Sequence, residues 1–251
     1  MNEASGLEGR SCLIVGATTG IGRATAELLA RRGTRLLLSA RDAARCAEAV
    51  EALAPLTEVH GCPGDMSSAA DMARVAAEAK RGLGAIDLAF INAGKILGAG
   101  LLQEVDLDCA RAAFELNALG VLNVLRAVLP RMTEAQRGAI VINSALSALR
   151  PRPLIGAYAA AKVAAINLAE TAALEAGPHG VRVNVVAPGY IGSAAWLAKL
   201  GEQAASLAQT VPLRRIGTPA EVAQVVAWLL SDASSYVNGA VLPVDGGLRL
   251  A

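Results

Sequence analysis

The sequence predicts an α/β protein in which a seven-stranded parallel sheet is covered by helices on both faces. Three observations lead to this fold class. Short β-branched or leucine-rich runs alternate with longer segments of helical spacing along the whole chain. The short runs are apolar, as expected of parallel strands that are buried on both faces. Right-handed crossovers between such strands give a doubly wound sheet, whose ligands bind at the carboxyl ends of the strands.

Seven strands and six helices are predicted, and they follow one another in alternation. The predicted strands, in chain order, are Cys12–Val15, Arg35–Ser39, Thr57–Gly61, Ile86–Ile91, Ala139–Asn143, Val181–Val186 and Ala240–Val244. The predicted helices between them are Ile21–Arg32, Ala43–Ala54, Ala69–Arg81, Leu107–Arg131, Tyr158–Ala176 and Ala220–Leu230. The last helix has the clearest start, because Thr218 can cap it and Glu221 can complete a capping box around Pro219. No linker, repeat or low-complexity tract divides residues 1–251, so we expect a single domain.

The composition argues against several classes of protein. Hydrophobic residues make up 54% of the chain and charged residues 18%, which allows a large core and disfavours disorder. Lys and Arg number 23 against 22 Asp and Glu, so neither a nucleic acid nor an anionic membrane surface is an expected partner. Apolar runs stop short of 18 residues and the opening residues are polar. We therefore expect no transmembrane helix, no secretory leader and a cytoplasmic location.

The cysteines and histidines do not suggest a metal site. Cys12, Cys46, Cys62 and Cys109 lack the close spacing of metal ligands, and the chain has only two histidines. Buried free thiols in a reducing cytosol are the simplest interpretation.

A glycine-rich loop joins the first predicted strand to the first helix. Its glycines permit a tight turn and the close approach of a pyrophosphate, whose charge is favoured at a helix N-terminus. Glycines in a turn are often only structural, but the strand–loop–helix context favours dinucleotide binding. The spacing is GxxxGxG rather than GxGxxG. The loop residues expected at the dinucleotide are Gly16, Thr18, Thr19, Gly20, Ile21 and Gly22.

This spacing resembles the short-chain dehydrogenase/reductase family, and the resemblance extends over nearly the whole chain. Further motifs of the family follow in order at Asn92-Ala93-Gly94, Asn117, Tyr158 with Lys162, Pro188-Gly189 and Asp245-Gly246-Gly247. The stretch from Val211 to Gly247 looks most like bacterial β-ketoacyl-carrier-protein reductases and their relatives. The resemblance implies a Rossmann-type fold and a nicotinamide dinucleotide. It implies cofactor contacts at Asn92, Ala93, Gly94, Tyr158, Lys162, Pro188 and Gly189.

The end of the second strand bears on the choice of dinucleotide. An NAD enzyme of this family usually has an acid there for the ribose 2′-OH, but this chain has Ala40 followed by Arg41. A guanidinium can clamp a 2′-phosphate, although Arg41 could instead be a solvated surface residue. The family's other NADP marker, a basic residue in the glycine loop, is replaced by Thr19. The residues favour NADP(H) over NAD(H).

The resemblance also implies contacts to the two rings of the dinucleotide. Asp65 and Met66 match the pair that flanks adenine, although Asp65 could alternatively cap the helix near Ser67. Ile191 and Ser193 match the positions that hold the carboxamide of nicotinamide.

The catalytic residues implied by the resemblance are Asn117, Ser144, Tyr158 and Lys162. Tyr158 and Lys162 are four residues apart and share one helical face, so the ammonium lies near the phenol. Together with the positive nicotinamide ring of the oxidised dinucleotide, it should lower the pKa of the phenol. Tyr158 would then protonate the carbonyl oxygen as hydride arrives, and Lys162 would also bond the nicotinamide ribose. Asn117 would kink its helix and hold a water for the proton relay. A plain surface pair and a plain capping asparagine are the structural alternatives.

The serine of the family is displaced in this chain. Most members have a serine 13 residues before the tyrosine, and here that position is Ala145. Ser144 lies one residue earlier and Ser147 two later, while a one-residue slip in a strand moves a side chain to the other face. We favour Ser144, on a loop that holds one extra residue. Ser147, or no serine at all, remains open.

The leading hypothesis is an NADPH-dependent oxidoreductase that interconverts a ketone and a secondary alcohol. Residues Tyr190–Pro212 should form a lid over a mostly apolar small-molecule substrate, with Trp196, Leu197, Leu200 and Leu207 either on the substrate or in ordinary core contacts. A carrier-linked substrate is in doubt, because His179 stands where a stronger base usually meets the carrier. The alternatives are a dinucleotide-binding scaffold or regulator with little redox activity, and a dehydration or epimerisation that begins with hydride transfer.

The chain is also expected to assemble. Helices Leu107–Arg131 and Tyr158–Ala176 are rich in alanine and leucine on more than one face. A helix that is apolar nearly all round must be covered on its outer side as well. We expect a homo-oligomer, namely a tetramer with two-fold axes.

Overall fold

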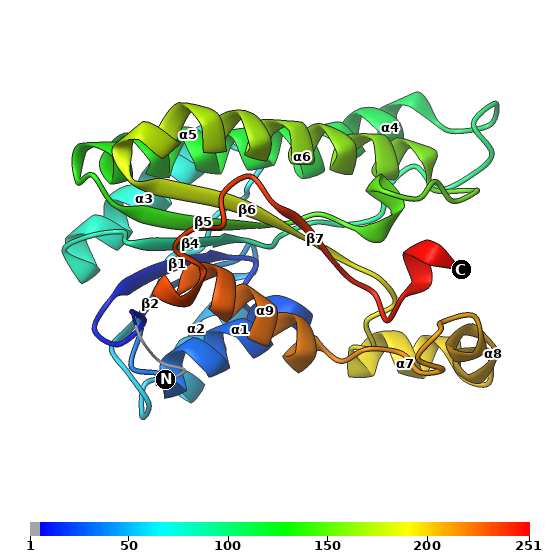
Figure 1. Cartoon of the computed structure of the whole chain (residues 1–251), viewed down its shortest axis with the longest axis horizontal. Coiled ribbons are helices and arrows are strands. Elements are labelled where there is room, and N and C mark those ends of the chain that lie inside the picture. The colour runs from blue at the N-terminus through cyan, green and yellow to red at the C-terminus, as the bar shows by residue number, and fades with distance from the viewer. Residues whose placement is uncertain (1–5) are drawn as a thin grey trace.

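The computed structural model describes residues 6–251, and its seven strands form one parallel sheet in the order β3-β2-β1-β4-β5-β6-β7. The chain starts in the middle of the sheet, builds one half outward, and returns to β4 to build the other half (Figure 1). This order confirms the predicted doubly wound fold. The strands are β1 Ser11–Val15, β2 Arg35–Ser39, β3 Val59–Gly61, β4 Leu88–Ile91, β5 Gly138–Asn143, β6 Val181–Pro188 and β7 Val241–Val244.

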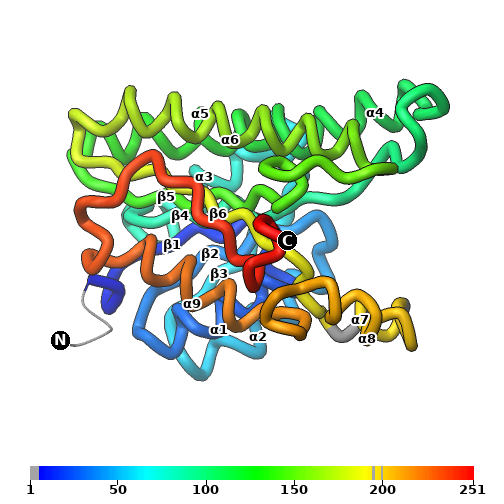
Figure 2. The backbone as a smooth tube through the Cα atoms, turned by 45° about the vertical axis from the view of Figure 1, so that its right-hand side comes forward, coloured from blue at the N-terminus to red at the C-terminus, as the bar shows by residue number. Residues whose placement is uncertain are grey.

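Helices cover both faces of the sheet. The helices α1 Gly20–Arg31, α2 Ala43–Leu53 and α9 Pro219–Leu230 lie on one face (Figure 1). The opposite face carries α3 Ala69–Leu83, α4 Leu107–Phe114, α5 Gly120–Glu134 and α6 Gly156–Ala176. Two short helices, α7 Ala194–Leu200 and α8 Gln203–Gln209, extend beyond the sheet at one end, near the C-terminal segment (Figure 2).

The apolar strands are explained by two separate cores. Leu13 and Val15 of β1 face the core on the α3–α6 side, whereas Cys12 and Ile14 face the core under α1 and α9. Because both faces of the strand are buried, alternation between polar and apolar residues is lost. Phe90 in β4 has no exposed surface, so it anchors the centre of the sheet.

The long helix expected over Leu107–Arg131 is interrupted. The chain forms α4, then a π-helical turn at Glu115–Leu119, and then α5, which continues to Glu134 with Pro130 inside it. A π turn adds one residue to a helical turn and is common at functional sites. The interruption coincides with Asn117, which the sequence had singled out.

Two predicted strands begin later than expected, and polar side chains just before each observed strand form other hydrogen bonds. Thr57 donates its hydroxyl to the carbonyl of Thr34 at 3.0 Å, and β3 begins only at Val59. Asp87 accepts from the backbone and hydroxyl of Ser11 at 3.0 and 2.9 Å, and β4 begins at Leu88. These bonds fix the amino ends of the strands away from the expected ligand edge.

Two further expectations can be compared with the structure, and the one for Cys109 needs correction. The helical stretch Leu107–Glu134 is long and apolar enough to cross a membrane by length and composition, although no run of 18 apolar residues is visible in the sequence. About 44% of its apolar window is buried inside the protein, and a single helix of this kind is weak evidence of a membrane span. Cys12, Cys46 and Cys62 are buried free thiols as expected, but Cys109 is exposed because it lies in the first turn of α4, on the solvent side.

Candidate active site

Two cavities open at the carboxyl edge of the sheet, one on each side of the loop between β1 and α1. The first has a volume of about 470 Å³ and is lined by the glycine loop and by the ends of β2, β3 and β4. The second has a volume of about 630 Å³ and is lined by the ends of β5 and β6, the start of α6, and α7 and α8. Because every strand is parallel, all of these chain ends meet at one edge.

The glycine loop is shaped so that a ligand can approach its backbone. Gly16 and Gly20 have φ angles of +88° and +53°, a region that L side chains rarely adopt. A Cβ at Gly16 would lie 2.6 Å from the amide nitrogen of Ala93, and a Cβ at Gly22 would overlap the carbonyl of Gly16. Thr19 makes no side-chain cap to α1, and the first turn holds no acid. The free N–H groups and the helix dipole therefore fit a pyrophosphate.

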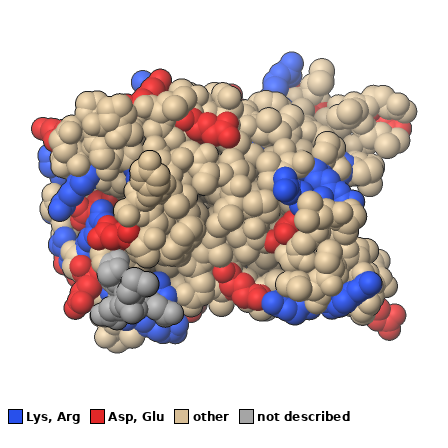
Figure 3. Space-filling view, viewed as in Figure 1, with Lys and Arg blue, Asp and Glu red and all other residues tan. Residues whose placement is uncertain are grey.

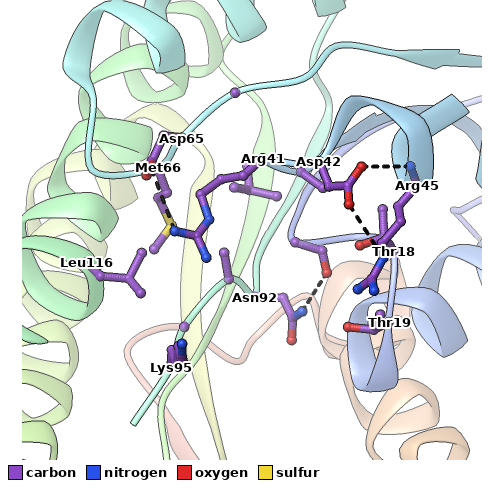
Figure 4. A pocket seen from close by; sticks show the side chains of 16 residues that line it. Thr18, Thr19, Arg41, Asp42, Arg45, Asp65, Met66, Asn92, Lys95 and Leu116 are labelled. Atoms are coloured by element: carbon purple, nitrogen blue, oxygen red, sulfur yellow. Dashed lines mark hydrogen bonds and ion pairs between the residues drawn. The ribbon is translucent and has the colours of Figure 1, made fainter. Parts of the chain in front are cut away.

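The first cavity contains two arginines where one was expected. Arg41 extends across it, with Nη1 4.0 Å from Oδ2 of Asp65, while Arg45 lies beside Thr18 (Figure 4). Arg45 Nε is 3.5 Å from the carboxylate of Asp42, which caps α2. Both arginine side chains are mostly exposed. Sequence reasoning missed Arg45, although its position four residues after Arg41 could have indicated it.

Asp65 and Met66 both line the first cavity. The helix-capping role that was the alternative for Asp65 belongs to Ser68, whose hydroxyl accepts from the Asp71 amide at 3.2 Å. Asp65 Oδ1 accepts from the backbone and hydroxyl of Ser67 at 2.9 and 2.7 Å, in the turn before the helix. Met66 is 2% exposed and packs beneath Gly120, where a Cβ would lie 3.0 Å from its methyl carbon. Contacts within the protein thus fix Asp65 and Met66, and both residues line the same cavity.

Tyr158 and Lys162 lie together at the start of α6. Tyr158 lines the second cavity, and Lys162 Nζ is 5.9 Å from the centre of its ring. Lys162 is 2% exposed and donates to the backbone carbonyl of Asn143 at 2.8 Å. Burial lowers the pKa of Lys162 to about 8. Burial also raises the pKa of Tyr158 to about 12, because the phenolate loses its hydration. The lowering expected from the sequence requires the oxidised nicotinamide ring as well as the ammonium.

Asn117 forms the π turn and ties it to the end of β4. Its Nδ2 donates to the carbonyls of Ala113 at 2.9 Å and Lys95 at 3.0 Å, and its Oδ1 accepts from the Lys95 amide at 3.2 Å. In a regular helix, the backbone N–H of residue 117 would donate to the Ala113 carbonyl. Here the side-chain amide of Asn117 donates to that carbonyl. A Cβ at Gly94 would lie 2.9 Å from both Asn117 Oδ1 and Lys162 Nζ. The glycine therefore lets these two groups approach the end of β4.

A chain of amides connects the lysine to the glycine loop. Asn143 Nδ2 donates to Asn92 Oδ1 at 2.9 Å, and Asn92 Nδ2 donates to the carbonyl of Gly16 at 2.7 Å. The backbone carbonyl of Asn143 is the one that receives Lys162. Sequence reasoning missed Asn143, which carries no signal beyond its position at the end of a strand.

The serines of the β5–α6 loop have different environments. Ser144 is 4% exposed and donates its hydroxyl to the backbone carbonyl of Lys162 at 3.1 Å. Ser147 lies in the short turn Leu146–Ala148, is 7% exposed, and its Oγ is buried without a hydrogen-bond partner among the described residues. Both serines and Ala145 line the second cavity together with Tyr158. The proton of the Ser144 hydroxyl is thus already in use within the protein.

The residues expected at the nicotinamide line the same cavity as Tyr158. They are Pro188, Gly189, Ile191 and Ser193, with Ile21 of the glycine loop beside them. The backbone of Ile191 pairs with Gly217 in an isolated bridge, and Ser193 caps α7 by accepting from the Trp196 amide at 3.3 Å. The expected cofactor residues therefore fall into two groups. The residues expected at the adenosine line the first cavity, and those expected at the nicotinamide line the second.

Known proteins are similar to this chain in both sequence and fold. The family model described as Enoyl-(Acyl carrier protein) reductase matches residues 16–249. The 3-oxoacyl-(acyl-carrier-protein) reductase FabG of Thermotoga maritima is 37% identical over 252 residues, covering 96% of this chain and 98% of that protein. An L-sorbose reductase from Gluconobacter frateurii, complexed with NADPH and L-sorbose, has a TM-score of 0.94 at 26% identity and covers 99% of each chain. A xylitol dehydrogenase with bound NAD⁺ has a TM-score of 0.92 at 31% identity, covering 96% of this chain and 99% of the other. Proteins similar to this chain thus bind either dinucleotide.

Proposed function

The chain belongs to the short-chain dehydrogenase/reductase family, and from this premise we propose that it interconverts a ketone and a secondary alcohol with NADP(H). Its relatives are oxidoreductases of the dehydrogenase/reductase type. The observation that carries the proposal is the position of Tyr158 in the wall of a cavity at the carboxyl edge of the sheet, with the Lys162 ammonium behind its ring. An acid with this placement can reach a carbonyl oxygen in the cavity.

The protein's own groups are suited to move one proton. A bound dinucleotide would supply or accept the hydride. Tyr158 would give its phenolic proton to the carbonyl oxygen in reduction and take it back in oxidation. Lys162 holds positive charge near the phenol, and its one protein bond to Asn143 leaves two N–H donors for the nicotinamide ribose and a water. Asn117 would position that water from the π turn.

A scan of ketones with NADPH and of secondary alcohols with NADP⁺, followed by dinucleotide absorbance, tests the proposal. Turnover of at least one carbonyl class is expected. Dinucleotide binding without any turnover would favour the scaffold or regulator hypothesis. A product that has lost water or inverted a centre, with no net change in dinucleotide, would favour the dehydration or epimerisation hypothesis.

Ser147 is the serine that we propose polarises the substrate carbonyl, in place of Ser144. The Ser144 proton is committed to the Lys162 carbonyl, whereas the Ser147 hydroxyl has no described partner. A buried hydroxyl without a partner costs free energy, and a substrate oxygen in the adjoining cavity could supply the missing acceptor.

The cofactor preference should depend on the two arginines of the first cavity. Arg41→Ala should weaken NADPH binding about tenfold while leaving NADH binding nearly unchanged, because only NADPH carries the 2′-phosphate. Arg45→Ala should have the same sign, and the double variant should lose the preference. Dissociation constants from protein fluorescence quenching would measure this. Equal losses for both dinucleotides in Arg41→Ala would mean that Arg41 does not recognise the phosphate.

We also propose a homotetramer. Leu107, Phe114 and Leu119 on the α4–π-turn side, and Val163 and Leu174 on α6, are exposed large apolar residues, with Leu174 80% exposed. The face that carries β7 and adjoining parts of α6 and α9 shows few charges (Figure 3). Light scattering at micromolar concentration should give about four times the chain mass of 25.5 kDa. A mass of one chain would refute the assembly.

The second cavity and the cysteines support our proposals for the substrate and the location. Trp196, Leu200 and Leu207 from α7 and α8 line the second cavity, which supports a small, mostly apolar substrate beneath these helices. The buried free thiols support a cytoplasmic location, where they remain reduced.

A further inference from the structure

The second cavity contains one charged group that the proposed chemistry does not use. Its walls are mostly apolar, and among its described lining residues Arg152 alone has a charged side chain. None of the described lining residues is acidic. Arg152 is exposed to solvent, so its charge stays hydrated while the residue lines the cavity beside the apolar walls.

Arg152 is held in position by aromatic rings and not by a carboxylate. Its guanidinium lies 4.9 Å from the centre of the Tyr190 ring, within the range of a cation–π contact. The Tyr190 ring in turn stacks on Trp196 of α7 at 6.4 Å. Within residues 6–251, no carboxylate forms an ion pair with Arg152, whereas Arg10, Arg35 and other arginines are paired. The guanidinium therefore lies over the Tyr190 ring without a carboxylate partner among the described residues, and its N–H groups remain available to a ligand.

Arg150, two residues earlier, shows the alternative use of an arginine in this loop. Its Nη1 donates to the carbonyl of Leu248 at 2.6 Å and ties the loop to the C-terminal segment. Arg150 does not belong to the described lining of the cavity. The two arginines thus have separate tasks, and only Arg152 faces the space that contains Tyr158.

We propose that the substrate is a ketone, or the matching alcohol, that carries a carboxylate remote from the reacting carbon, and that Arg152 binds this carboxylate. The proposal rests on the proposed function, because it assigns the far end of the same substrate. The planar fork of N–H donors matches a carboxylate in two parallel hydrogen bonds. The apolar walls between Arg152 and Tyr158 suit the carbon skeleton between the two polar ends.

The test compares a homologous series of methyl-ketone carboxylates with the primary amides of the same length. The wild-type protein should prefer the best carboxylate over its amide by about tenfold or more in kcat/KM, and added salt should reduce this preference. Arg152→Met should remove the preference by lowering kcat/KM for the carboxylate alone. Arg152→Lys should retain part of it, because the charge remains and the fork is lost. Arg150→Met is the matched control and should leave the ratio unchanged.

Calorimetric binding of the same carboxylates and amides in the presence of NADPH gives a second measurement that does not need turnover. Equal binding of acid and amide, or an equal loss of both in Arg152→Met, would overturn the carboxylate proposal while ketone reduction itself could stand. Absence of turnover for every ketone and alcohol would instead overturn the proposed function, and the binding ratio would still decide the role of Arg152.

Discussion

Tyr158→Phe is expected to lower kcat for carbonyl reduction by about 100-fold or more, which is the scale of general acid catalysis. The substitution keeps the ring that fills the cavity wall and removes only the phenolic proton. The stability of the fold should change little, because the tyrosine hydroxyl forms no hydrogen bond with the described protein groups. Steady-state kinetics with NADPH and the best ketone from the scan would measure the loss.

NADPH binding is the control for this variant. Its dissociation constant should stay within about threefold of the wild-type value, since the phosphate and adenosine positions lie on the other side of the glycine loop. Near-normal turnover by Tyr158→Phe would exclude Tyr158 as the acid. A parallel loss of NADPH binding would instead indicate a structural effect of the substitution.

The pH dependence should identify the lysine. Reduction needs a protonated phenol and a charged ammonium, and burial brings the pKa values to about 12 for Tyr158 and about 8 for Lys162. Both groups are in the required state below pH 8. As the pH rises through about 8, Lys162 loses its charge first, so kcat/KM should fall about tenfold per unit from there. A flat profile up to pH 10 would mean that the charge of Lys162 is not required.

The sheet could be predicted from the sequence because its signals are local and repeated. Each strand is a short apolar run, and the two buried faces of β1 explain why Cys12, Leu13, Ile14 and Val15 are all apolar. The boundaries were less accurate, since β4 starts at Leu88 and the Asp87 carboxylate is bonded to Ser11, which lies 76 residues earlier. A contact over that distance in sequence leaves no local pattern.

The site was predicted where motifs encode backbone demands, and missed where contacts depend on tertiary structure. Gly16, Gly22 and Gly94 are required by close approaches that the motifs record. Arg45 and Arg152 face the cavities only because α2 and the β5–α6 loop place them there. The burial that raises the pKa of Tyr158 was also missed, because burial cannot be read from the spacing of a tyrosine and a lysine.

Ser147→Ala should cost about 2–4 kcal/mol of transition-state stabilisation, the scale of losing one donor to a developing oxyanion. The expected readout is a fall in kcat of roughly 30-fold to 1000-fold, with NADPH binding unchanged. The reason is that the Ser147 hydroxyl is buried beside the Tyr158 cavity with its hydrogen bond unmade among the described residues. Removing an orphaned hydroxyl should not destabilise the fold, and thermal unfolding should show a Tm equal to or above that of the wild-type protein.

Ser144→Ala is the matched control and should behave in the opposite way. It loses the 3.1 Å bond to the Lys162 carbonyl, so the free energy of unfolding should fall by about 1 kcal/mol while kcat stays within about threefold.

Ala145→Ser in the Ser147→Ala background returns a hydroxyl to the position where most of the family has it, and should recover part of the activity. If Ser144→Ala abolishes turnover and Ser147→Ala is silent, Ser144 is the polarising serine. If both are silent, the carbonyl oxygen is polarised by Tyr158 or by another hydroxyl of the cavity wall, and Tyr190 and Ser193 are the described residues that carry one.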